Sequence, residues 1–157
     1  QLQVGSSGKT PILIVEDDAD AALLLRKMLE DAGYSSDIAG NGAAALKACG
    51  QQRYAAVVLD LMLPDMNGVD IIRQLRAQPS TRELPIVVAS AQTENGKLTI
   101  NGDVPGIVWL SKPVDQRIFL KELGELVTKA NTEAFEVLTK RFTESFEELK
   151  DVGAKAA

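Results

Sequence analysis

Histidine is absent from this chain of 157 residues, and cysteine occurs once, at Cys49. Without imidazole the chain cannot form a histidine metal site, a Ser-His-Asp hydrolase or a phosphohistidine of its own. Any histidine-dependent step must therefore be supplied by another protein. A single cysteine cannot form a disulfide within the chain, which favours a reducing, cytoplasmic setting.

The sequence also lacks an excess of positive charge and a long apolar run. Its net charge is −5, and no basic stripe is present, which argues against a nucleic-acid surface. No segment approaches the roughly 18 apolar residues that cross a bilayer, and no charged-then-apolar signal segment opens the chain. We therefore expect neither a nucleic-acid partner nor a membrane partner for this chain.

What is present is an alternation of strand and helix signals from Pro11 to about Ala130, the pattern of an α/β fold. Most of the expected strands are β-branched and show no polar alternation, as in a parallel sheet covered on both faces. They are residues 12–15, 35–39, 55–59, 86–89 and 107–110, of which 35–39 gives the weakest signal. We expect one domain over residues 10–130, preceded by linker-like residues 1–9.

Apolar residues at helical spacing predict helices over about 21–32, 42–50, 69–75 and 119–127. Gly33 is placed to stop the first of these helices, and Asp115 is placed to cap the last. Asn95-Gly96 and Asn101-Gly102 interrupt the interval where a further helix belongs, so that helix should be short or mobile.

Residues 131–157 form a separate segment. Its Phe135, Leu138, Phe142 and Leu149 lie at offsets of three, seven and fourteen residues, which predicts one apolar seam along an otherwise charged helix. Two arrangements remain open: an extension that packs on its own domain, or a connector helix that forms a dimer or joins another domain.

Four of the apolar segments run into residues that can handle a phosphate: Glu16-Asp17, Asp60, Ser90 and Lys112. Each residue alone has an ordinary explanation as a helix cap, a turn hydroxyl or a surface lysine. Their joint occurrence is more informative, because ligands of parallel sheets bind beyond the carboxyl ends of the strands. Carboxylates, a hydroxyl and an ammonium group at one edge suit a divalent cation together with a phosphoryl group.

At these residues the chain resembles the receiver domain of two-component response regulators, over roughly Thr10 to Ala130. Asp60 precedes Ser90 by 30 residues and Lys112 by 52, as the family pattern requires. The stretches that carry the resemblance are 12–18, 60–68, 90–91 and 109–113. The resemblance implies a doubly wound, flavodoxin-like α/β fold with a five-stranded parallel sheet of order 2-1-3-4-5, followed here by a C-terminal helical extension.

The resemblance also implies a role for each matching residue. Asp60 looks like the phosphoacceptor, and Mg²⁺ or Mn²⁺ would be held by Glu16, Asp17, Asp60 and the backbone carbonyl of Met62. The residues expected to bind the phosphoryl group or to switch are Ser90, Lys112 and Trp109. Those expected to shape the loops are Pro64 and Gly68, with Gly68 in a conformation closed to other residues, and Pro113, which suggests a cis Lys-Pro bond.

The implied partner is a histidine kinase or phosphotransfer protein that donates a phosphoryl group in trans. Such a domain catalyses only its own phosphorylation and dephosphorylation, and is not a turnover enzyme for metabolites. Phosphorylation of Asp60 would draw Ser90 inward and let Trp109 turn in, with residues 93–102 as the moving element.

Three other functions compete with this interpretation. A receiver-like scaffold that has lost phosphorylation would bind partners without a phosphate. A phosphatase of the haloacid-dehalogenase type would need a second aspartate two residues after Asp60, where Met62 stands. A flavin or nucleotide binder would need a glycine-rich phosphate loop after the first strand, which is absent.

Overall fold

The computed structural model describes residues 10–91, 93 and 105–156. The sequence places the interrupted fourth helix largely in residues 94–104, which lie outside the described part. Five strands form one sheet: β1 (Ile12–Val15), β2 (Ser36–Ala39), β3 (Ala56–Leu59), β4 (Ile86–Ser90) and β5 (Ile107–Ser111). The helices between and after them are α1 (Ala19–Asp31), α2 (Gly42–Gln51), α3 (Gly68–Ala77) and α5 (Gln116–Ala156).

All paired strands of the sheet run parallel, in the order β2-β1-β3-β4-β5, and this confirms the predicted doubly wound fold. The register places Val15 opposite both Ala39 and Leu59, so β1 and β3 end side by side at the centre of the sheet. The backbone N–H of Asp60 also donates to the carbonyl of Val15. The residues that follow β1 and those that follow β3 are therefore neighbours in space, although they are far apart in the sequence.

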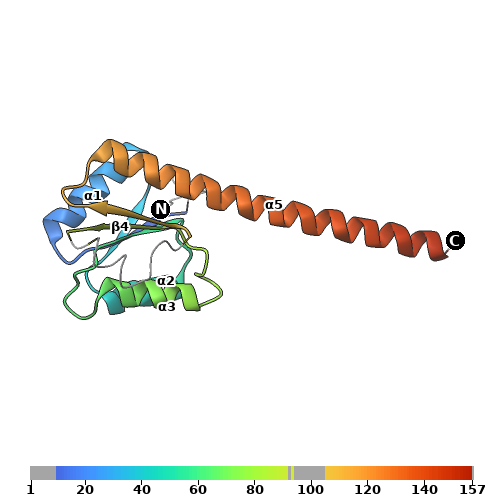
Figure 1. The fold of residues 1–157 in the computed structure, drawn as a ribbon, viewed down its shortest axis with the longest axis horizontal. Coiled ribbons are helices and arrows are strands. Elements are labelled where there is room, and N and C mark those ends of the chain that lie inside the picture. The colour runs from blue at the N-terminus through green and yellow to red at the C-terminus, as the bar shows by residue number, and fades with distance from the viewer. Residues whose placement is uncertain (1–9, 92, 94–104, 157) are drawn as a thin grey trace, which may run out of the picture.

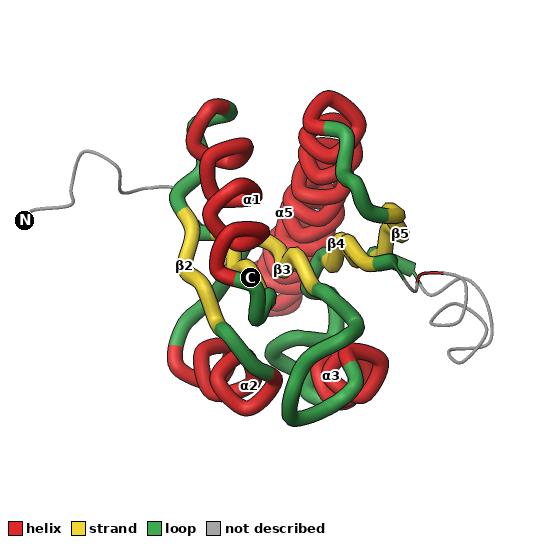
Figure 2. The backbone as a smooth tube through the Cα atoms, turned by 90° about the vertical axis from the view of Figure 1, so that its left-hand side faces the viewer, coloured by secondary structure: helices red, strands yellow, loops and turns green. Residues whose placement is uncertain are grey.

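Helices cover the sheet on both faces. Figure 2 shows α1 and α5 on one side of the strands and α2 and α3 on the other. Alternate side chains of β1 serve the two layers: Leu13 and Val15 join the core with α2 and α3, whereas Ile12 and Ile14 join the core with α1 and α5. Burial on both faces explains why the central strands are continuously apolar.

Short polar side chains fix where the helices begin. The Asp18 carboxylate accepts hydrogen bonds from the N–H groups of Asp20 and Ala21, and thereby caps α1. Asn41 caps α2, Asn67 caps α3 and Asp115 caps α5 in the same way. The Asp18 carboxylate therefore has a structural role as the cap of α1, unlike the carboxylates of its neighbours Glu16 and Asp17.

The two helical segments predicted after Asp115 form one helix of 41 residues, α5. Phe119 and Leu123 are fully buried under the sheet and anchor its first part. The remainder continues well beyond the domain (Figure 1). At the rise of an α-helix, the 41 residues of α5 span about 60 Å. In the described residues, no helix is long and apolar enough to cross a membrane.

Replacement of Phe119 by alanine should lower the free energy of unfolding by about 3–5 kcal/mol, because it leaves a cavity between α5 and the sheet. Replacement of the neighbouring Ile118, which is 52% exposed, should change it by less than about 0.5 kcal/mol. Urea unfolding followed by circular dichroism measures both values. Equal losses for the two variants would mean that α5 is not anchored through Phe119.

Candidate functional site: a carboxylate cluster at the edge of the sheet

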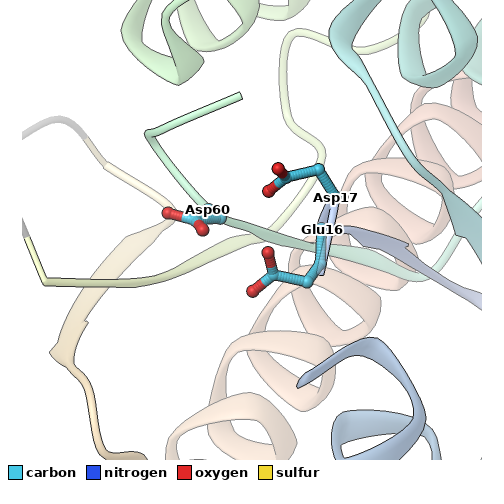
Figure 3. Close-up of side chains that lie close together, drawn as sticks. All are labelled: Glu16, Asp17 and Asp60. Atoms are coloured by element: carbon cyan, nitrogen blue, oxygen red, sulfur yellow. The ribbon is translucent and has the colours of Figure 1, made fainter. Parts of the chain in front are cut away.

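Three carboxylates meet where β1 and β3 end. Glu16 and Asp17 follow β1, Asp60 follows β3, and one ligand oxygen from each lies within 4.8 Å of the others. Figure 3 shows the three side chains approaching one another from the two strand ends. The pairing of Val15 with Leu59 is what brings them together, since the next residue of each strand begins the cluster. The convergence expected from the sequence is therefore present for these residues.

The three carboxylates differ in their exposure to solvent. The Glu16 side chain is 2% exposed and that of Asp60 is 11% exposed, whereas Asp17 is exposed. Buried carboxylates are costly unless a positive charge or hydrogen-bond donors compensate them. The interior side of the cluster therefore needs a compensating group.

Lys112 supplies that compensation. Its Nζ donates to Oε1 of Glu16 at 2.5 Å and to Oδ2 of Asp60 at 3.2 Å. Lys112 follows directly after β5, two strands away from β3 in the sheet, and its backbone N–H donates to the carbonyl of Ser90 at 3.2 Å. Lys112 thus connects the ends of β1 and β3 through its ammonium group and the end of β4 through its backbone.

The environment shifts the pKa values of this pair. Burial raises the pKa of Glu16, and this effect exceeds the lowering by the hydrogen bond from Lys112. Burial acts to lower the pKa of Lys112, but the hydrogen bond to Glu16 and the charge of Asp60 raise it above its usual value. Lys112 therefore remains charged at neutral pH.

The loop that follows Asp60 folds back onto it. The N–H of Met62 donates to Oδ1 of Asp60 at 3.1 Å, and the side chain of Met62 is exposed to solvent. Both oxygens of Asp60 are thus engaged, one by this N–H and the other by Lys112. Pro64 lies exposed in the same loop.

Gly68 shapes the loop for a different reason from the one the sequence suggested. It does not adopt a positive φ; among the described glycines only Gly33 and Gly106 do. Instead, a Cβ atom at Gly68 would lie 2.7 Å from the Cα of Leu61 and 2.8 Å from the carbonyl oxygen of Asp60. The expectation of a conformation closed to other residues is wrong. The close approach of two backbones, which no local sequence pattern reveals, is the reason for glycine here.

Asp65 helps to fix the loop after Asp60, a role that the sequence interpretation missed. Its two carboxylate oxygens accept from the N–H groups of Gly42 and Ala43 at 2.8 and 2.9 Å, at the start of α2. These backbone hydrogen bonds lower the pKa of Asp65. The contact joins residues 23 positions apart, so only the turn-like composition around Asp65 hinted at a structural role. It fixes the loop after Asp60 against α2.

The remaining predicted residues lie on β4 and β5. Ser90 is fully buried at the end of β4, opposite Ser111. The Lys112-Pro113 peptide bond is cis, as expected. The Trp109 side chain extends from β5 and packs, half-buried, against the core that includes α2 and α3. Its indole Nε1 is buried and has no hydrogen-bond partner within the described residues. Trp109 is therefore not a member of the carboxylate cluster.

Comparison with known proteins agrees with this geometry. A family model for the response regulator receiver domain matches residues 12–124. The chain belongs to this family. The matched segment includes the whole sheet and all residues of the cluster.

Relatives of this receiver domain include regulators and sensor proteins. The DNA-binding response regulator MtrA of Mycolicibacterium paratuberculosis (strain ATCC BAA-968 / K-10) is 32% identical over 127 residues, which are 81% of this chain and 55% of MtrA. A solved sensor protein from Polaromonas sp. JS666 is 41% identical, with a TM-score of 0.72 over 77% of this chain and 98% of that one.

A third relative is the receiver domain of a sensor histidine kinase from Pseudomonas aeruginosa PAO1. It is 26% identical, with a TM-score of 0.69 over 77% of this chain and 99% of that one, and its structure holds a magnesium ion in the active-site cleft. The present chain spans about half the length of the curated relatives that it matches.

Replacement of Gly68 by alanine should destabilise this receiver domain by about 1–3 kcal/mol, because backbone atoms of Asp60 and Leu61 cannot move aside for a Cβ. Gly50 is a matched control, since it lies in α2 with no atom within 4 Å of the place its Cβ would take, and should gain up to about 1 kcal/mol as alanine. Chemical denaturation of both variants checks this. A neutral Gly68→Ala variant would contradict the close approach.

Proposed function

We propose that this receiver domain accepts a phosphoryl group on Asp60, in a reaction that depends on Mg²⁺ or Mn²⁺. The observation that carries the proposal is the convergence of Asp60 with Glu16, Asp17 and Lys112 at the carboxyl edge of the sheet. Asp60 is the member of this group at the end of a central strand with Lys112 on one oxygen and a backbone N–H on the other.

The charges of the cluster fit a divalent cation. Three carboxylates face one ammonium group, so their formal charges leave an excess of two negative charges within a small volume. Mg²⁺ prefers carboxylate and carbonyl oxygens, and we assign Glu16, Asp17, Asp60 and the Met62 carbonyl as the groups that would hold it. When bound, the metal neutralises negative charge on the phosphoryl oxygens and on the carboxylates.

The protein's own residues then perform the transfer. A carboxylate oxygen of Asp60 attacks phosphorus and forms a new P–O bond, while the P–N bond to the donor's histidine breaks and the nitrogen keeps the electron pair. Negative charge spreads over the phosphoryl oxygens, and Lys112 is close enough to Asp60 to offer its ammonium group to one of them. We assign the second contact to the Ser90 hydroxyl.

The signal would leave the site through Ser90 and Trp109. A contact between Ser90 and the phosphoryl group would change the packing at the end of β4, which pairs with β5 and therefore adjoins Trp109. Such a change shifts a population between existing conformations. The segment that we expected to move, residues 93–102, lies almost entirely outside the described residues, so the proposal for it rests on the sequence.

The donor that we propose is a histidine kinase or a phosphotransfer protein acting in trans, because the chain has no histidine. Relatives include a receiver domain of a histidine kinase and a DNA-binding regulator. An output domain joined to this receiver, and action in the cytoplasm as a signalling module rather than a metabolic enzyme, are part of the same proposal.

Incubation with acetyl phosphate and Mg²⁺ should add one phosphoryl group to the wild-type chain and none to an Asp60→Asn variant. Asp18→Asn is the matched control: it removes a neighbouring carboxylate but retains helix capping, so it should be phosphorylated like the wild type. Intact-protein mass spectrometry measures the added mass, and chelation of the metal should reduce it at least about tenfold. A wild-type chain that stays unmodified would instead favour a phosphate-independent scaffold.

A further inference from the structure

Among the residues that the structure describes, the outer part of α5 has no domain surface to pack against. The helix is continuous from Gln116 to Ala156, and Figure 1 shows its last part extending alone beyond the sheet and the other helices. A helix in water gains most of its stability from the packing of an apolar face. The described side chains of this part that are exposed include Glu133, Lys140 and Glu147. We therefore infer the binding partner of this part of α5 from the sequence pattern on the opposite side of the helix.

That pattern is a heptad repeat. From position 135 onward, the residues that recur at spacings of three and four are mostly apolar, as at the a and d positions of a coiled coil. The a positions are Phe135, Phe142, Leu149 and Ala156, and the d positions are Leu138, Ser145 and Val152. Because α5 is helical throughout this range, these positions share one side of its backbone. They form the outer seam of α5.

We propose that the outer seam binds the outer seam of a second copy of this chain, with the two helices antiparallel. The charges that flank the seam support this partner and this orientation. Arg141 and Glu148 occupy g positions, which face each other across an antiparallel pair, so each Arg141 would lie opposite Glu148 of the second copy. Twofold symmetry makes this complementary pair occur twice.

A parallel pair would lack this complementarity. There, g positions face e positions, and Arg141 would lie opposite Phe146 and Glu148 opposite Gly153 of the second copy. The sizes of the seam residues also favour the antiparallel pair. An antiparallel pair aligns Phe142 with Ser145, Phe135 with Val152 and Leu138 with Leu149, so each phenylalanine meets a smaller residue, whereas a parallel pair aligns Phe142 with itself and Ser145 with itself.

Charge reversal in the chain of 157 residues tests the partner. The wild type should form a dimer by sedimentation equilibrium, and Arg141→Glu or Glu148→Arg alone should weaken it about tenfold, since two attractive pairs become repulsive. An equimolar mixture of these two variants should regain wild-type affinity. Lys140→Glu reverses a neighbouring charge on the outer face and should have no effect. Asp60→Asn should also have none, which keeps this test separate from that of the phosphoacceptor.

Cysteine crosslinking tests the orientation in a Cys49→Ala background. Antiparallel pairing predicts a disulfide between a Phe142→Cys chain and a Ser145→Cys chain when they are mixed, and little with either chain alone. Efficient crosslinking of Ser145→Cys with itself would establish a parallel pair and overturn the proposal. A wild-type chain that remains monomeric at all concentrations would overturn it as well, and would leave the outer seam to a different domain.

Discussion

The ammonium group of Lys112 is the interaction on which the site depends. It contacts Glu16 and Asp60, which follow β1 and β3, while the backbone N–H of the same residue donates to Ser90 at the end of β4. Two like charges at the separations found here would repel by a few kcal/mol even at an effective dielectric constant of about 20. With Lys112 in place the repulsion is partly offset, and the remaining negative charge is what favours a divalent cation.

The fold places this group by strand register rather than by local structure. Parallel pairing puts Val15 beside Leu59, and each following residue then enters the cluster. Gly68 lets the loop after Asp60 turn back against that strand end, and Asp65 fixes the same loop to the first N–H groups of α2. Strand register and these two contacts thus hold the carboxylates in place before any ligand binds.

Much of this arrangement was predictable from the sequence. The apolar, β-branched segments gave the strands within about one residue, and the residue types that follow them identified Glu16, Asp17, Asp60 and Lys112, because parallel strands end at one edge. Contacts between distant segments were not predictable. The hydrogen bonds from Gly42 and Ala43 to Asp65, and the steric need for glycine at position 68, both depend on which backbone segments approach each other. The continuity of α5 was also missed, since Asn131 resembles a helix boundary in sequence but costs a helix less than about 1 kcal/mol.

The central claim is that the carboxylates of Glu16, Asp17 and Asp60 form a divalent-cation site next to Lys112. Anomalous diffraction from crystals soaked in Mn²⁺ tests it most directly, because the ion is located without reference to any activity. The account predicts one strong peak among the oxygens of these three side chains. A peak elsewhere on the protein, with none at this edge of the sheet at saturating Mn²⁺, would contradict it.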